Sequence, residues 1–448
     1  MRYDGFMQHI PRIVFTFEEM IGSLRQAIKN FSDKRIGKNT TYTMMDVGAG
    51  AFSVFFTQSP SFLAHQRMMQ LRYGINNART LFAIKDIPTD THIRDTLDPV
   101  TPSVLDPVFH NCLSALERSG YLDTFRTGIG ENDLLITLDG TWYFSSEHIH
   151  CSQCSTKTHK GKTVYQHGMI NPAIVAPGKR VAIALPPEFI LPQDGDKKQD
   201  CEHKAAKRWL VSHKATYAAF HATMLGDDLY CHQPMCELIR SNGFNFILVC
   251  KPDSHKTLYE WIEGITETKV VNKQTKGKTE TWTYRFCCGV PLKDGDTALL
   301  VNWCELTVER EGRQIFRNAF ATNHPITREN VEIIVAAGRS RWKTENENTN
   351  TLKTKGYHLE HNYGHGTKHL ASLLATMNIL AFLFHTMLEF MNKKYKLLRL
   401  MIGTRVCFFN DFRAMVKFVC FSSFNNMLQW MIDGLKKQHD VALIPVPV

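Results

Sequence analysis

Between residues 134 and 250 the chain alternates short apolar runs with longer segments of helical periodicity, and this order restricts its fold more than any other feature. Apolar runs at 134–138, 164–169, 174–175 and 180–185 predict strands, and three strands in sequence fit an antiparallel meander. A helix at 201–222, a short strand at 222–225, a helix at 233–242 and a buried strand at 244–250 follow. This order predicts an α/β fold in which a mixed sheet is flanked by helices.

The regions on either side of this core have a different character. Residues 1–130 have mainly helical periodicity and include many basic residues, which makes them a candidate DNA-binding region or, alternatively, a scaffold. Strand-like alternation over 258–325 predicts a β-rich insertion, and helical sequence returns near residue 328. We therefore divide the chain into a helical N-terminal region (1–130), the first part of a core (131–257), the insertion (258–325), the second part of the core (326–400) and a C-terminal helical region (401–448).

Composition narrows the class of protein. A hydrophobic content of 43% and a charged content of 21% are typical of a folded globular chain. The net charge of +10 suits a polyanionic partner such as nucleic acid, although basic enzymes without such a partner share it. Twelve scattered cysteines and the lack of a signal peptide favour a reducing, cytoplasmic compartment. Polar residues interrupt the apolar stretch 370–390, so we expect a buried helix rather than a membrane span.

Acidic residues follow two of the predicted strands. Asp139 comes directly after the run 134–138, where a strand end would hold its carboxylate rigidly and Gly140 would leave room for a metal ion or a phosphate. Asp227 and Asp228 follow the strand at 222–225. Adjacent side chains on an extended segment point in opposite directions, so we expect one of the two to face the site and choose Asp227, at the strand end. An ordinary turn, or a helix cap for Asp228, is the alternative.

A third acidic residue, Glu345, lies four residues after Arg341. On a regular helix this spacing places both side chains on one face. A carboxylate beside a guanidinium stays ionised and can hold a divalent metal ion. An exposed surface pair is the alternative, and Glu347 competes for the acidic role.

The order of these acidic residues, with their surroundings, resembles the DDE transposases of bacterial insertion sequences, particularly the cut-and-paste group with a β-rich insertion before the glutamate. The matching segments are Leu138-Asp139-Gly140-Thr141, Gly226-Asp227-Asp228-Leu229-Tyr230, Arg341-Trp342-Lys343-Thr344-Glu345 with Leu352-Lys353, and the stretches 356–362 and 76–82. The resemblance covers about residues 65–435. It implies an RNase H-like catalytic core in which Asp139, Asp227 and Glu345 bind metal and Arg341 and Lys353 contact DNA.

Two positions depart from the family pattern. The family usually has Tyr three residues before the arginine, where this chain has Gly338. Its lysine usually follows the glutamate by seven residues, whereas Lys353 follows Glu345 by eight. On a regular helix the extra residue turns Lys353 by about 100°, which weakens its expected phosphate contact more than it weakens the triad.

The resemblance also implies a reaction and partners. Two Mg²⁺ ions, with Mn²⁺ as a substitute, would serve cleavage of transposon ends and strand transfer into target DNA. The expected partners are double-stranded DNA, as terminal repeats and as target, and a second copy of the chain, in a prokaryotic cytoplasm at the nucleoid and without a membrane. Trp303 in the insertion would stack on a flipped base, unless it is a core residue of a strand. A degenerate relative that binds DNA without cutting it and a structure-specific nuclease on the same core are the alternatives.

A cluster of cysteines and histidines follows the first predicted strand. The pair Cys151 and Cys154 has the spacing of a zinc-binding Cys-x-x-Cys unit. His150 and His159 are the further ligands that we propose for structural zinc, with His148 and Cys201 as other candidates. Free thiols in a polar loop are the alternative, and a zinc-based nucleic-acid module without catalysis is a third functional interpretation.

Overall fold

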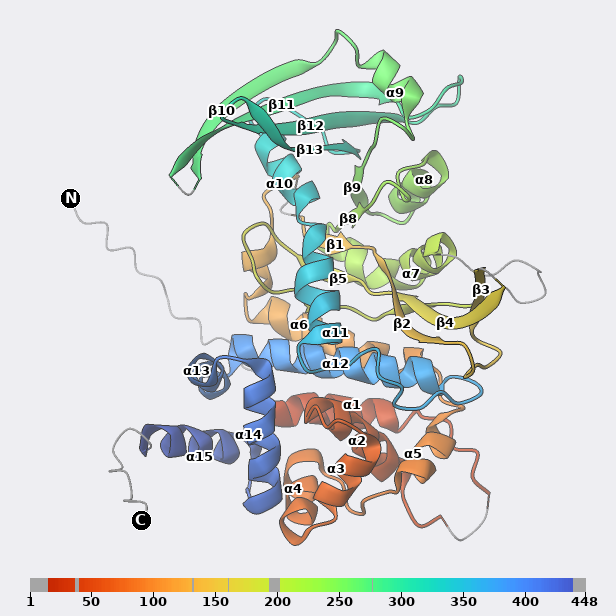
Figure 1. The fold of residues 1–448 in the computed structure, drawn as a ribbon, viewed down its shortest axis with the longest axis vertical. Helices are drawn as coiled ribbons and strands as arrows, with labels where there is room; N and C mark the ends of the chain where they lie inside the picture. Colours follow the sequence, from red (N-terminus) through yellow and green to blue (C-terminus); the bar gives the residue numbers. More distant parts are fainter. Residues whose placement is uncertain are drawn as a thin grey trace. The chain divides into compact units, whose positions relative to one another are not determined.

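The computed structural model describes residues 15–36, 40–130, 133–159, 161–192, 202–275 and 277–437, and these form two compact units (Figure 1). The helical unit comprises Met1–Asp123, His148–Gln153 and Thr351–Val448, and the sheet unit comprises Thr124–Glu147 and Cys154–Asn350. This division corrects the expected one. The N-terminal and C-terminal helices share one unit, and the insertion belongs to the same unit as the core.

The helical unit is built from amphipathic helices that mostly begin at a capping hydroxyl. Its elements are α1 (Phe17–Ile28), α2 (Met44–Phe56), α3 (Phe62–Met69), α4 (Arg72–Phe82), α5 (Asp90–Leu97), η1 (Pro102–Leu105), α6 (Asp106–Arg118), α12 (Leu370–Met391), α13 (Lys393–Ile402), α14 (Arg405–Phe418) and α15 (Phe424–Lys437). Thr16 caps α1 in a capping box with Glu19. Thr89 caps α5 by accepting from the backbone N–H of His92.

Aromatic side chains join the two ends of the chain inside the helical unit. Phe17 of α1 stacks on Phe424 of α15 with ring centroids 4.2 Å apart. The Asn77 side chain of α4 donates to the backbone carbonyls of Val416 and Val419 at 2.8 and 2.7 Å. Long-range contacts of this kind explain why the N-terminal and C-terminal helices fold together in one unit.

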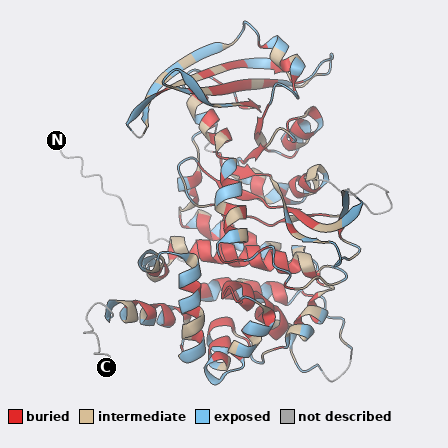
Figure 2. Cartoon of the chain, in the orientation of Figure 1, coloured by how far each residue is buried: buried red, intermediate tan, exposed pale blue. Residues whose placement is uncertain are grey.

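Helix α12 is the core helix of this unit. By length and composition it could cross a membrane, but 89% of its most apolar stretch is buried (Figure 2). It packs against α2, α5 and α6 of the same unit. The expected buried helix at 370–390 is therefore confirmed.

The sheet unit contains two sheets. Its strands are β1 (Leu135–Thr137), β2 (Gly140–Ser146), β3 (Ser155–His159), β4 (Lys162–Ile170), β5 (Ala173–Val175), β6 (Ile183–Ala184), β7 (Glu188–Ile190), β8 (Thr223–Gly226), β9 (Asn245–Val249), β10 (Glu267–Thr275), β11 (Lys278–Pro291), β12 (Leu300–Arg310) and β13 (Arg313–Thr322). The larger sheet has the order β10-β11-β12-β13-β9-β8-β1-β5-β6, and β2, β4, β3 and β7 form the smaller one. The expected mixed sheet is thus present.

Strands β1, β8 and β9 run parallel at the centre of the large sheet, and β5 and β6 continue it antiparallel beyond β1. The meander therefore consists of β1, β5 and β6. The run 164–169 does not join it, because β4 pairs with β2, β3 and β7 in the smaller sheet. The β-rich insertion is present and extends the large sheet, since β13 pairs with β9.

Helices connect and cover these strands. They are α7 (Glu202–Tyr217), η3 (Ala218–Phe220), α8 (Gln233–Ser241), α9 (Lys256–Trp261), α10 (Val331–Arg339) and the π-helix η4 (Thr344–Thr349), with η2 (Leu122–Phe125) and α11 (Asn350–Thr354) at the boundaries between the units. Helix α10 packs directly on β9, β11 and β12. At Gly338 a Cβ atom would lie 2.8 Å from the Phe320 ring and 2.9 Å from Ile247. The close approach of helix and sheet therefore requires glycine here and has no room for the tyrosine of the family pattern.

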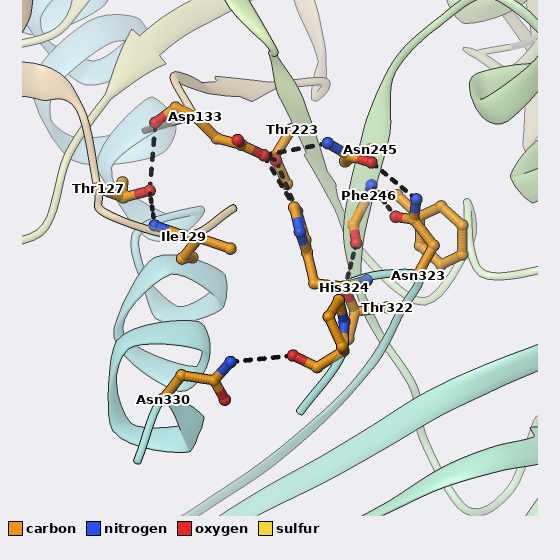
Figure 3. A network of polar contacts seen from close by, with 11 residues as sticks. Thr127, Ile129, Asp133, Thr223, Asn245, Phe246, Thr322, Asn323, His324 and Asn330 are labelled. Atoms are coloured by element: carbon orange, nitrogen blue, oxygen red, sulfur yellow. Dashed lines mark hydrogen bonds and ion pairs between the residues drawn. The ribbon is translucent and has the colours of Figure 1, made fainter. Parts of the chain in front are cut away.

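A buried polar network closes the amino-terminal ends of the three parallel strands (Figure 3). Asp133, just before β1, accepts from the Thr223 hydroxyl at 2.5 Å and from the Asn245 side chain at 3.1 Å. His324 Nε2 lies 2.8 Å from the same hydroxyl and 3.3 Å from Asp133. Asn323 donates to Asn245 at 2.8 Å. Hydrogen bonds thus tie the starts of β1, β8 and β9 to the end of β13.

Candidate active site at the ends of β1 and β8

The parallel pairing of β1 and β8 brings two of the predicted acidic residues to one sheet edge. Thr137 is in register with Leu225, and the backbone N–H of Leu138 donates to the Leu225 carbonyl at 2.8 Å. Asp139 directly follows Leu138, and Asp227 directly follows Gly226, the last residue of β8. Both therefore lie at the carboxyl ends of the two strands. Ligands of open α/β sheets bind at this edge.

The charges around Asp139 show that the acidic residues converge. Burial raises the pKa of Asp139 to about 6, Arg341 opposes the shift, and the negative charges of Glu202, Asp227 and Glu345 raise the pKa further. Arg341 Nη1 lies 3.6 Å from Asp139 Oδ1, and both side chains are about one-quarter exposed. Carboxylates from three other segments and one guanidinium therefore act on Asp139 at this edge.

The helix expected to carry Arg341 and Glu345 is irregular. Helix α10 ends at Arg339, Arg341 lies in a turn, and Glu345 belongs to η4. The expected helical face is therefore wrong, although both charges act on Asp139. A π turn contains one residue more than an α turn, so the 100° displacement expected for Lys353 does not apply to this segment. Glu347, the competitor, interacts with Lys343.

Asn171 fixes η4 relative to Asp139. Its backbone N–H donates to the Asp139 carbonyl at 3.0 Å, and its side chain donates to the Thr349 hydroxyl at 3.3 Å. Its own carbonyl accepts from the Asn348 side chain, also at 3.3 Å. All three hydrogen bonds are buried or lie in the backbone, so one residue of the β4–β5 connection links the strand end to the π-helix that carries Glu345.

Glu202, the first residue of α7, is a member of the site that the sequence did not reveal. Its Oε1 accepts from the Tyr230 hydroxyl at 2.6 Å. A Cβ atom added at Gly140 would lie 2.3 Å from Glu202 Oε2. The space that Gly140 leaves beside Asp139 is therefore taken by Glu202, and the expectation that it is open to a metal ion or a phosphate is wrong.

Asp227 and Asp228 face different surroundings. Asp227 acts on Asp139, and its Oδ1 accepts from the Leu229 backbone at 3.0 Å. Asp228 turns to the segment after β9, where it accepts from the Lys251 N–H at 2.7 Å and from the Ser254 hydroxyl at 2.5 Å. The two neighbours thus diverge as expected, although Asp228 lies in the turn after β8 and not on an extended segment.

The predicted DNA-contacting residues are placed less favourably. Trp303 is fully buried on β12, where its ring packs edge-on against Tyr259 at 5.7 Å. It is a core residue and cannot stack on a base in this structure, so its expected role is wrong. Lys353 lies in the helical unit, and its ammonium group pairs with Glu360 at 2.9 Å.

The expected zinc ligands are only partly described. Cys154 is buried with its Sγ 3.4 Å from Nε2 of His167, a residue outside the predicted set. His150 is exposed, and its Nδ1 lies 3.1 Å from the His148 carbonyl. Cys151 is half-buried. Cys201 and the side chain of His159 lie outside the described part of the structure.

Comparison of the chain with protein-family models and with curated proteins gave no match. The residues at the strand ends are therefore the features from which function can be inferred. Their donors are carboxylate oxygens, which suit Mg²⁺ better than a softer metal. Burial, together with the neighbouring negative charges, raises the pKa of Asp139 even though Arg341 lies beside it. This donor set fits a divalent cation.

Proposed function

We propose that this protein is a DNA transposase of the DDE type, which cleaves transposon ends and joins them to target DNA. Two observations carry the proposal: Asp139 and Asp227 lie at the ends of neighbouring parallel strands, and the negative charges of Asp227 and Glu345 act on Asp139. The three residues come from segments that lie far apart in the sequence, in the order that the resemblance requires. Structural acidic residues have no reason to gather where their charges repel.

The strand order supports an RNase H-like core. Asp139 follows the first strand of the meander β1-β5-β6, and Asp227 follows β8, the next strand of the large sheet along the chain. Glu345 follows the β-rich insertion, on the first helical segment after α10. These are the positions that the family resemblance implies for the triad.

The chain's own residues would prepare the site for phosphoryl transfer. Asp139, Asp227 and Glu345 would hold Mg²⁺, which supplies activation of the attacking oxygen and stabilisation of the leaving oxygen. Arg341 keeps Asp139 ionised, and Asn171 fixes the distance between the strand end and η4. Glu202 is held by Tyr230 and adds to the negative field that favours a cation.

Double-stranded DNA is the substrate that we propose. The net charge of +10 favours a polyanion, and basic side chains such as Arg67, Arg72 and Arg79 are exposed on α3 and α4. Pairing of two transposon ends would require a second copy of the chain on DNA. These partners follow from the proposed reaction and are tested with it.

The test uses the full chain and a plasmid that carries its coding sequence with the flanking DNA. With Mg²⁺ the wild-type protein should nick at the flanks and join the released 3′-hydroxyl to a second plasmid. Asp139→Asn, Asp227→Asn and Glu345→Gln should abolish both steps, whereas Glu347→Gln, on the same π-helix, should retain them. A wild-type rate in any of the three variants would remove that residue from the triad.

The same assay separates the alternatives. Binding of DNA without nicking would identify a degenerate relative, and nicking without joining would identify a nuclease. Nicking that persists in the presence of EDTA would contradict the metal-dependent mechanism altogether.

A further inference from the structure

Two cysteines and a histidine meet beside the loop that carries Asp227. Cys231 lies four residues after Asp227, Cys250 is the first residue after β9, and His255 immediately precedes α9. One ligand atom from each residue lies within 4.8 Å of the others, and all three residues are buried. The group belongs to the sheet unit and is separate from the Cys-x-x-Cys unit that the sequence suggested.

The histidine has a buried nitrogen that makes no hydrogen bond of ordinary geometry. His255 Nε2 lies 3.5 Å from Asp228 Oδ1, and the imidazole interacts with the Cys231 thiol and has a backbone hydrogen bond to Leu292. A buried polar atom without a partner is uncommon in folded proteins and calls for an explanation. Histidines that bind metal usually bond a carbonyl through one ring nitrogen and coordinate through the other. His255 has this arrangement.

We propose that Cys231, Cys250 and His255 form a buried site for a soft divalent cation, and that zinc is the ion this donor set favours. Tetrahedral zinc holds two thiolate sulfurs about 3.8 Å apart, so the residues need to shift by no more than about 1 Å. Asp228 Oδ1, 3.5 Å from His255 Nε2, is placed to supply the fourth ligand. Binding would displace the protons of the two thiols to solvent, with no redox step.

The site would fasten three segments together. The backbone N–H of Cys231 donates to the Asp228 carbonyl at 3.2 Å, and that of Cys250 donates to the Ala319 carbonyl at 2.9 Å. The Asp228 side chain already holds the segment 251–255 through Lys251 and Ser254. A metal ion here would therefore lock the turn after β8 to the ends of β9 and β13, and hold Asp227 in place.

The test is the zinc content of the full chain, purified under reducing conditions without chelator. Cys231→Ala and His255→Ala should each lower bound zinc by one equivalent per chain. Cys236→Ala is the matched control, because Cys236 is also fully buried nearby but lies outside the group. Cys151→Ala measures any zinc held elsewhere. Asp139→Asn should keep this zinc, so the result is independent of the proposed catalytic activity.

Cobalt provides a second measurement that needs no variant. Wild-type protein refilled with Co²⁺ should show the visible absorption of a tetrahedral site and the charge-transfer band of a cobalt thiolate. Wild-type protein without bound zinc and without these bands would overturn the proposal, even if the variants fail to fold. Zinc content that is unchanged in both Cys231→Ala and His255→Ala would also overturn it, as would a Cys231–Cys250 disulfide in the reduced preparation.

Discussion

The three parallel strands β1, β8 and β9 begin and end in polar clusters of opposite kinds. At their amino-terminal ends, Asp133 accepts from Thr223 and Asn245 and lies beside His324, so polar groups find partners inside the protein. At their carboxyl ends, Asp139 meets three further negative charges, and buried His255 Nε2 makes no hydrogen bond of ordinary geometry. The two clusters are separated by the length of a short strand.

Buried polar clusters differ in whether their own side chains satisfy one another. A network whose donors and acceptors match one another stabilises the fold and needs nothing further. A cluster whose charges repel, or whose donors are left over, is stable only if something outside the chain completes it. The same strands thus have a structural end and an end that we assign to ligands.

The largest effect should come from the triad. Replacement of Asp139 by Asn should lower the rate of Mg²⁺-dependent nicking by about a thousandfold, because a lost metal ligand removes several kcal/mol of transition-state stabilisation. Its unfolding free energy in the absence of metal should not fall, because one repelling charge is removed. Urea unfolding and nicking assays on the same preparation measure both. A variant that is less stable but still active would contradict the assignment of the carboxyl ends to ligand binding and would make Asp139 a structural residue.

A substitution at the amino-terminal ends of the strands should lower stability and leave the nicking rate unchanged. Asp133→Ala leaves Thr223, Asn245 and His324 without their shared acceptor, which should cost about 3 kcal/mol of stability. Variant protein that remains folded should nick DNA at nearly the wild-type rate. If this variant were as stable as wild type, the network would not be the structural feature that its geometry indicates.

The sequence predicts the strands well and their partners poorly. The runs at 134–138 and 244–250 became β1 and β9 because both are short, apolar and bounded by polar residues. Nothing in the run 164–169 says that it pairs with β2 instead of β1. Pairing of strands depends on side chains far away in the sequence, which local periodicity does not record.

Some residues of the candidate site could be predicted from the sequence and others could not. Asp139 and Asp227 could be found because each follows an apolar strand, and Glu345 because Arg341 lies nearby. Glu202 could not, since it lies 63 residues after Asp139 in a segment that reads as a solvated acidic loop. Cys231, Cys250 and His255 do not have the sequence spacing of a known metal-binding motif. The Cys-x-x-Cys unit at 151–154 does, so the sequence predicted a zinc site there.

The helical unit also contains a buried polar cluster whose groups satisfy one another, and it should make the free energy of unfolding depend on pH. His65 is buried among the hydroxyls of Ser53, Thr57 and Ser59. Burial, with a smaller effect of Arg413, lowers the pKa of His65 to about 3. An unfolded histidine has a pKa near 6.5, so the unfolded chain binds more protons between these values and stability falls as pH falls.

From pH 7 to pH 5 this residue should remove about 2 kcal/mol from the free energy of unfolding. Urea unfolding at both pH values measures the loss. His65→Gln should flatten the pH dependence by that amount, whatever its stability at pH 7. An equal slope in wild type and variant would show that His65 does not titrate in this range.

The smallest effect on the nicking rate should come from Tyr230. This residue lies at the carboxyl ends of the strands but carries no negative charge. Its hydroxyl donates to Glu202, and burial raises its pKa well above the ordinary value, so it stays a donor. Tyr230→Phe should slow nicking about tenfold, as for other partners of metal-site carboxylates. Tyr284→Phe is the control, because Tyr284 is equally buried but contacts Lys273 in the insertion. Equal rates in the two variants would mean that Glu202 is held by packing alone and that the site's negative field does not depend on this hydrogen bond.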